Sequence, residues 1–113
     1  MMRLALGVLG LLAGPVLAER SGAVLAGDEI SATLTGARLT YAGGAWQEFL
    51  PSGRTLYNAG SDSWGYWEVS GDHYCSQWPP ADGWACYEVS RGADGEIGFR
   101  GESGHVTWGV IEK

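Results

Sequence analysis

The chain has 113 residues, of which 45% are hydrophobic and 18% are charged, and its formal net charge is −6. This length and balance suit one folded domain and exclude a disordered acidic tail. With no basic stripe along the chain, nucleic acid is also excluded as an expected partner. Six Trp, five Tyr and 19 Gly favour short strands and tight turns over helices.

Residues 1–18 are predicted to be an export signal. Arg3 precedes an apolar run that extends to Leu12, and Val16 and Ala18 stand at the positions that a signal peptidase reads. The apolar stretch is interrupted by Gly and Pro and is shorter than the roughly 20 residues of a membrane-spanning helix. We therefore expect a periplasmic or secreted protein with no stable membrane span after cleavage. An uncleaved N-terminal anchor is the alternative.

The segment Gly27–Gly36 predicts one short helix. Asp28 is placed to cap its start, and Ile30 and Leu34 fall on one face at i, i+4 spacing. The glycine that ends the segment suits the left-handed conformation that stops a helix. Nothing after this glycine has helical periodicity.

The rest of the chain breaks into short β-prone runs separated by turn residues. Short loops make consecutive strands antiparallel neighbours, and a meander of this length curls to cover its edges. We therefore predict a mainly β domain at residues 27–113, after a loose leader at 19–26. Its architecture is an antiparallel meander of seven or eight short strands curled into a small barrel or half-barrel. The expected strands are Ala37–Tyr41, Ala45–Leu50, Arg54–Tyr57, Trp64–Ser70, His73–Trp78, Trp84–Arg91, Glu96–Arg100 and His105–Glu112.

Two cysteines, Cys75 and Cys86, are the only ones in the chain. An even number in an exported chain favours a disulfide, which contributes about 3 kcal/mol in the chain-entropy model. The alternative is half of a zinc site, but the second pair of ligands that such sites need is missing. We expect a disulfide, no bound metal and no cofactor.

Alternation along the strands predicts which side chains face the core. If the two cysteines face each other across a hairpin, Tyr74 lies opposite Tyr87. Both rings and Val89 then lie on the core face, and the disulfide lies on the other. The other expected inward pairs are Leu39 with Tyr41, Trp67 with Val69, Ile97 with Phe99, and Trp108 with Val110.

Catalytic motifs are scarce. The only histidines, His73 and His105, lie in no hydrolase motif, and no Gly-x-Ser-x-Gly sequence occurs. Most acidic residues fall at turns, where solvated carboxylates are common, and the two cysteines are too far apart for a Cys-x-x-Cys redox site. We therefore expect a protein that is not an enzyme and assign no catalytic residue.

The most distinctive segment is the loop that the expected disulfide closes. It carries Trp78, Pro79, Pro80 and Trp84, which form the candidate binding site. Rigid, exposed aromatic residues give binding loops a large contact area at low entropic cost. The alternative is that both tryptophans fold back and seal one end of the barrel.

Several short motifs form a familiar pattern along the chain. They are Asp28–Leu34 with Gly36, Phe49 before Ser52-Gly53, the strand Gly65-Tyr66-Trp67-Glu68-Val69, and the hairpin residues Tyr74-Cys75 and Cys86-Tyr87. The pattern resembles a group of small, uncharacterised periplasmic proteins of Gram-negative bacteria, over nearly all of the mature chain. The resemblance implies a small β domain and implies no activity.

These observations predict an exported, monomeric, non-enzymatic binding or structural domain of the cell envelope. The expected partner is an envelope protein, a glycan or a small ligand. The alternative is a small periplasmic inhibitor of a basic hydrolase such as a lysozyme, because an acidic chain suits a basic target.

Overall fold

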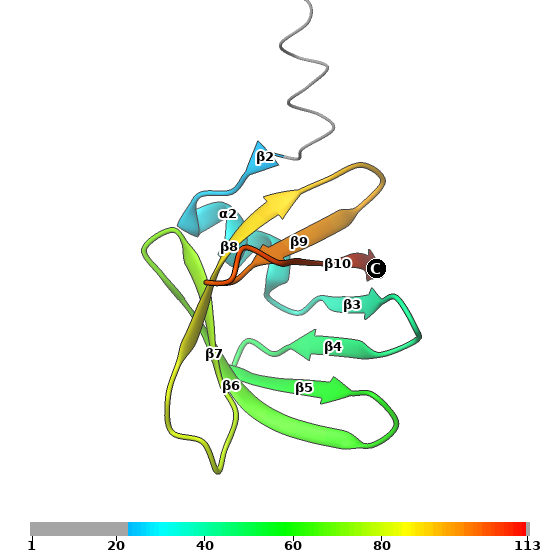
Figure 1. The fold of residues 1–113 in the computed structure, drawn as a ribbon, viewed down its shortest axis with the longest axis vertical. Helices are drawn as coiled ribbons and strands as arrows, with labels where there is room; N and C mark the ends of the chain where they lie inside the picture. The colour runs from blue at the N-terminus through cyan, green and yellow to red at the C-terminus, as the bar shows by residue number, and fades with distance from the viewer. Residues whose placement is uncertain (1–22, 113) are drawn as a thin grey trace, which may run out of the picture.

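The computed structural model describes residues 23–112, and Figure 1 shows them as one strongly curved sheet with a short helix. The predicted export signal at 1–18 lies outside the described residues. Within residues 23–112, no helix is long and apolar enough to cross a membrane.

Eight strands form a closed antiparallel barrel in simple chain order. Each strand from β3 to β10 pairs with the next one along the chain, and β10 returns to pair with β3. The predicted mainly β meander is therefore confirmed, and every expected strand is present with its ends shifted by at most two residues. The strands are β3 (Arg38–Tyr41), β4 (Trp46–Phe49), β5 (Arg54–Asn58), β6 (Asp62–Ser70), β7 (His73–Gln77), β8 (Ala85–Arg91), β9 (Glu96–Arg100) and β10 (Val106–Glu112).

A ninth strand, β2 (Ala23–Val24), pairs with the last residues of β8. β7 pairs with β8 only up to Tyr87, so the second half of β8 would otherwise present a free edge. Leu25 then enters the core, and its N–H donates a hydrogen bond of 2.8 Å to the carbonyl oxygen of Val89. The expectation of a loose leader at 19–26 is therefore wrong for residues 23–26.

Helix α2 (Gly27–Leu34) lies at the end of the barrel where β3 begins and β4 ends. The chain leaves the helix through Gly36, whose N–H donates to the carbonyl oxygen of Phe49 at 2.7 Å. Gly36 has a φ of +79°, the left-handed conformation predicted for it. Ile30 and Leu34 are fully buried, as their spacing predicts, so the helix packs its apolar face into this end of the barrel.

The start of the helix differs from the prediction. Asp28 does not cap it; the capping residue is Ala26, and the Asp28 carboxylate accepts a hydrogen bond from the neighbouring Glu29 N–H. Instead, the Glu29 carboxylate accepts from the Ala26 N–H at 2.8 Å. The Asp72 carboxylate reaches across from the β6–β7 turn and accepts from the Gly27 N–H at 2.7 Å. Asp28 sits two residues too far along the chain for this role, and a tertiary contact supplies the negative charge that favours a helix start.

The hydrophobic core fills the helix end of the barrel. Phe49 is at its centre and contacts the rings of Trp67 and Tyr74 edge-on, at centroid distances of 5.6 and 5.7 Å. The indole N–H of Trp67 donates to the carbonyl oxygen of Leu50 at 3.0 Å, so this buried polar atom is paired. The core residues are Leu25, Ile30, Leu34, Leu39, Phe49, Trp67, Tyr74, Val89, Ile97 and Phe99. All the expected inward residues outside β10 belong to this core or pack against it.

The inward assignment of Trp108 and Val110 is wrong. Both side chains are on the outer surface, with 38% and 45% of their area exposed. Between them, Gly109 faces the interior, where the Tyr41 ring occupies the space that a side chain would need. Trp108 lies against Gly98, its cross-strand neighbour, where a Cβ would be only 2.8 Å from the indole. Apolar residues on both faces of β10 therefore hide the alternation on which the assignment rests.

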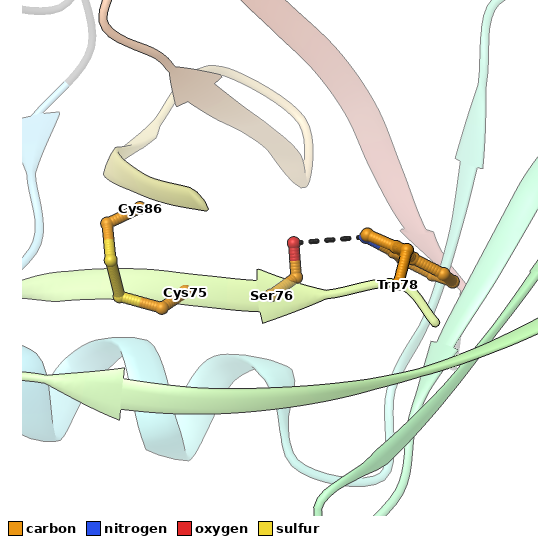
Figure 2. Close-up of a disulfide and its surroundings, with 4 residues drawn as sticks. All are labelled: Cys75, Ser76, Trp78 and Cys86. Atoms are coloured by element: carbon orange, nitrogen blue, oxygen red, sulfur yellow. Dashed lines mark hydrogen bonds between the residues drawn. A yellow bond between two sulfur atoms is a disulfide. The ribbon is translucent and has the colours of Figure 1, made fainter. Parts of the chain in front are cut away.

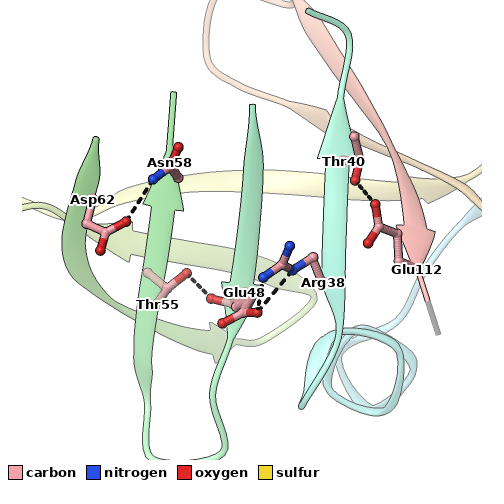
Figure 3. A network of polar contacts seen from close by, with 7 residues as sticks. All are labelled: Arg38, Thr40, Glu48, Thr55, Asn58, Asp62 and Glu112. Carbon is pink, nitrogen blue, oxygen red and sulfur yellow. Dashed lines mark hydrogen bonds and ion pairs between the residues drawn. The ribbon is translucent and has the colours of Figure 1, made fainter. Parts of the chain in front are cut away.

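Polar contacts link five adjacent strands, and all of them except that of the buried Thr55 lie on the outer face of the barrel (Figure 3). The strongest pair is Arg38 with Glu48, in which Nε and Nη2 of the guanidinium both donate to Oε2 of the carboxylate, at 3.0 and 2.8 Å. Arg38 also lies over the Trp46 ring, 3.9 Å from its centroid. The other contacts in Figure 3 are those of Thr40 with Glu112, Thr55 with the Glu48 carbonyl oxygen, and Asn58 with Asp62.

The predicted disulfide between Cys75 and Cys86 is confirmed (Figure 2). The cysteines are directly opposite each other on β7 and β8, and Tyr74 is opposite Tyr87, as expected. Tyr74 faces the core, so the bridge lies on the other face of the hairpin, where Cys75 is buried and Cys86 is exposed.

Reduction of this disulfide is expected to lower the free energy of unfolding by about 3 kcal/mol, because the open chain gains conformational freedom. Intact-mass analysis with and without reductant checks the bond itself, since the reduced protein gains two hydrogen atoms. Urea unfolding of both forms gives the change in stability. Two thiols that react with an alkylating agent before reduction would contradict the prediction.

Candidate functional site

A cavity of about 450 Å³ opens at the end of the barrel opposite the helix. This is the end where β3 runs into β4, and the turn residues Ala42 and Ala45 form part of its rim. The helix fills one end of the barrel and leaves the other hollow, and the volume lies in the range of small-molecule sites. The cavity is lined by Tyr41, Ala42, Ala45, Gln47, Tyr57, Tyr74, Ser76, Trp78, Tyr87, Phe99 and Thr107.

Tyrosine dominates the lining, which contains four of the five tyrosines of the chain. Each lies at an inward position of its strand, so the alternation that builds the core also builds the cavity wall. Tyr74 and Phe99, with ring centroids 5.2 Å apart, belong to both the core and the cavity lining and separate the two.

Glycines on or next to adjoining strands make room for several of these rings. Where such a ring lies against the backbone of another segment, the residue there has no side chain, and a Cβ would come into close contact with the ring. The pairs, with the distance from that Cβ to the nearest ring atom, are Trp78 on Gly65 (2.6 Å), Tyr41 on Gly109 (3.0 Å) and Tyr87 on Gly101 (3.2 Å). Each of these rings therefore has backbone close to it on one side, which limits its movement.

The Gln47 amide ties the phenols together inside the cavity. Its side chain is buried, its carbonyl oxygen accepts from the Tyr41 hydroxyl at 2.7 Å, and its NH₂ group donates to the Tyr74 oxygen at 3.2 Å. The same NH₂ group donates to Thr55 Oγ1 at 3.0 Å, and the Thr55 hydroxyl donates to the Glu48 carbonyl oxygen. This chain of hydrogen bonds fixes the orientation of two phenols before any ligand arrives.

Burial keeps these phenols uncharged. It raises the pKa of Tyr74 to about 12, and it raises the pKa of Tyr41 still further above its ordinary value. The lining contains no Asp, Glu, Lys, Arg or His. A charged ligand would therefore lose its hydration without gaining a counter-ion, which is costly. The site suits an uncharged molecule that has both apolar faces and hydrogen-bonding groups.

The raised pKa values predict a loss of stability in alkali. The folded state binds these phenol protons more tightly than the unfolded chain does. Their contribution to the free energy of unfolding is therefore complete below about pH 10 and is lost as the pH rises toward 12. For Tyr74 the loss across this range is on the order of 2–3 kcal/mol. Urea unfolding at intervals above pH 9 measures it. Tyr74→Phe should flatten the profile, whereas Tyr66→Phe, at an exposed position, should not; equal slopes in the two variants would contradict the assignment.

The structure separates the four candidate residues of the disulfide-closed loop. Trp78 is half-buried in the cavity wall, where its indole N–H donates to Ser76 Oγ at 3.2 Å (Figure 2). Its ring contacts the Tyr57 ring edge-on, with centroids 6.2 Å apart. The other three, Pro79, Pro80 and Trp84, lie on the surface outside the cavity lining, and 45% of Trp84 is exposed. Trp84 therefore does not seal the barrel, and Trp78 is part of the site.

Most of the cavity lining is not predicted from the sequence. Alternation predicts Tyr41, Tyr74 and Tyr87 as inward core residues and assigns no role to Tyr57 or Gln47. One feature of the sequence does indicate a cavity. Tyrosines occupy inward positions where a closed core would use Phe or Leu, and a buried phenol hydroxyl needs a hydrogen-bond partner. Alternation alone cannot show where a core ends and a cavity begins.

Together, these features define a closed up-and-down β-barrel with an uncharged, aromatic, ligand-sized cavity at one end. No protein-family model, no curated protein and no solved structure matches the chain. The resemblance to small periplasmic proteins of Gram-negative bacteria stays a prediction.

Proposed function

We propose that this protein is an exported, non-enzymatic binding domain that holds a small uncharged ligand in the open end of its barrel. The observation that carries the proposal is the cavity of about 450 Å³, with its uncharged aromatic wall and its hydroxyl and amide groups. The backbone at the glycines and the Gln47 network limit the movement of the rings before binding. Little freedom is then lost when a ligand enters, which favours affinity.

Binding accounts for this site better than catalysis does. The lining residues carry no imidazole, carboxylate, thiol or amine, which are the common acids, bases and nucleophiles. The raised pKa values of Tyr41 and Tyr74 keep these two phenols protonated at neutral pH, so they cannot act as general bases there. The disulfide supports export, because such bonds persist in oxidising compartments.

The proposal is tested with small ring compounds screened by protein-observed NMR, each neutral compound paired with a charged analogue of the same size. Neutral compounds should shift the resonances of cavity residues, and their charged analogues should not. Ala45→Trp places a large side chain on the cavity rim and should abolish these shifts. Ala59→Trp is the control, because Ala59 lies in the exposed β5–β6 turn, outside the cavity lining.

Two results would contradict the proposal. One is that no neutral compound shifts a cavity residue at millimolar concentration. The other is that Ala45→Trp and Ala59→Trp bind equally well, which would place the binding site elsewhere.

Inhibition of a basic hydrolase is a second candidate function, favoured by the exposure of the disulfide-closed loop. Trp84 has 45% of its area exposed, and Pro79 and Pro80 beside it are exposed as well. Titration of a basic lysozyme with the protein tests this function directly. Inhibition that Trp84→Ala removes and Ala45→Trp leaves intact would support it; full lysozyme activity at an excess of the protein would exclude it.

A further inference from the structure

A second hollow of about 370 Å³ lies beside the cavity and is called the outer groove here. It is lined by Tyr57, Ser63, Trp64, Trp78 and Pro79. Two of these residues, Tyr57 and Trp78, also line the cavity, and their rings meet at 75° with centroids 6.2 Å apart. The cavity and the outer groove are therefore neighbours that share this pair of aromatic rings.

The outer groove arises from a mismatch in strand length. β6 is nine residues long, but its ladder with β7 covers only Tyr66–Ser70. Beyond that point the chain of β7 leaves the sheet as the disulfide-closed loop, and no strand in the described part of the chain pairs with Asp62–Gly65 on that side. Trp78 lies on Gly65 in this gap. The wall of the barrel here consists of one indole ring in place of a strand.

The outer groove offers a flat aromatic surface of its own. Trp64 has 42% of its area exposed, and the Arg54 guanidinium lies 4.3 Å from its ring centroid, which restrains the indole. No charged residue lines the outer groove itself, and Arg54 at the Trp64 ring is the charged group next to it. Both hollows therefore offer aromatic rings that can contact the apolar surface of a ligand, together with hydroxyl groups that can hydrogen-bond to it.

Several hydroxyl groups that line the cavity and the outer groove are free to hydrogen-bond to a ligand. Tyr57, Ser63, Tyr87 and Thr107 form no side-chain hydrogen bond within residues 23–112. A ligand that fits must offer flat apolar faces to the rings and polar groups at its edges to these hydroxyls. It must also extend through both hollows and carry no charge.

We propose that the ligand is a neutral oligosaccharide of at least two sugar rings, with one ring in the cavity and the next against Trp64 in the outer groove. The inference rests on the proposed function and adds the class of ligand. A sugar ring combines an apolar C–H face with a hydroxylated edge and repeats both along a chain. A hydrocarbon would offer no hydrogen-bond partner to the hydroxyl groups of Tyr57, Ser63, Tyr87 and Thr107. An acidic saccharide would place a carboxylate in the cavity, whose lining carries no charge.

An array of neutral mono- to tetrasaccharides and their uronic-acid counterparts tests the proposal, followed by calorimetry of the best binders. Neutral di- and trisaccharides should bind at least about tenfold more tightly than the matching monosaccharide, because only they reach Trp64. Trp64→Ala should remove this tenfold advantage and leave monosaccharide affinity unchanged. Trp108→Ala is the matched control, because Trp108 is similarly exposed and lines neither hollow.

The outcomes separate this inference from the proposed function. If no neutral saccharide on the array binds, while neutral ring compounds still enter the cavity in an Ala45-dependent way, the oligosaccharide proposal is wrong and the binding function stands. If neither class binds, both are wrong. Equal affinities for mono- and disaccharides, or equal effects of Trp64→Ala and Trp108→Ala, would also overturn it.

Discussion

Leu34→Ala is expected to lower the free energy of unfolding by about 2–5 kcal/mol, enough to threaten the folding of a domain of this size. Leu34 is fully buried and belongs to the same core cluster as Leu39, Phe49 and Ile97. Removal of its side chain leaves a cavity where the helix closes the barrel, and closed barrel strands cannot move in to fill it. The penalty should therefore lie toward the upper end of the range.

Urea unfolding followed by circular dichroism measures this effect. Ser31→Ala provides the control on the same helix, because Ser31 is exposed and the change removes no apolar contact. Its stability should stay within about half a kcal/mol of the wild-type value. A Leu34→Ala loss as small as that of the control would show that the helix is not part of the core.

The barrel end that the helix fills is the part that the sequence predicts best. Its signals are local: i, i+4 spacing for Ile30 and Leu34, glycine at the helix end, and strand-length runs between turn residues. The two cysteines fix the register of their hairpin, and so the faces of Tyr74 and Tyr87. Where a feature depends on a distant partner, local signals fail. Asp72 reaches the helix start from a turn 45 positions away along the chain. β2 pairs with the part of β8 that extends beyond its ladder with β7.

The open end is harder to predict, because its walls are made by pairs of residues far apart in sequence. The sequence predicts Trp78 as a contact residue of an exposed loop, yet the indole lies against Gly65, which is on another strand. In the motif Gly65-Tyr66-Trp67-Glu68-Val69, alternation identifies Trp67 as a core residue but gives the glycine no role. The structure assigns it one, as the surface on which the indole lies.

Gly65→Ala is accordingly expected to disturb both stability and binding. A Cβ at this position would lie 2.6 Å from the carbonyl oxygen of Gln77 and 2.6 Å from the Trp78 ring. Because this oxygen belongs to the backbone, it cannot rotate away from the new Cβ as a side chain could. β6 and β7 must therefore separate at the end of their ladder. Overpacking of this kind costs about 1–3 kcal/mol and occasionally more. The displaced indole would also leave the lining that the cavity and the outer groove share, so affinity for any ligand of the cavity should fall.

Gly83→Ala is the matched control, because it changes the same residue type in the loop that carries Trp78. A Cβ at Gly83 meets no atom within 4 Å, so this variant should be as stable as the wild type or slightly more stable. The double variant Gly65→Ala/Trp78→Ala removes the clash with the ring but keeps the clash with the Gln77 oxygen, and should recover only part of the lost stability. Urea unfolding and near-ultraviolet circular dichroism of the three variants measure these differences. If Gly65→Ala matches Gly83→Ala in stability and leaves the aromatic spectrum unchanged, Trp78 does not depend on Gly65, and the indole must be held in the wall by Ser76 and Tyr57 alone.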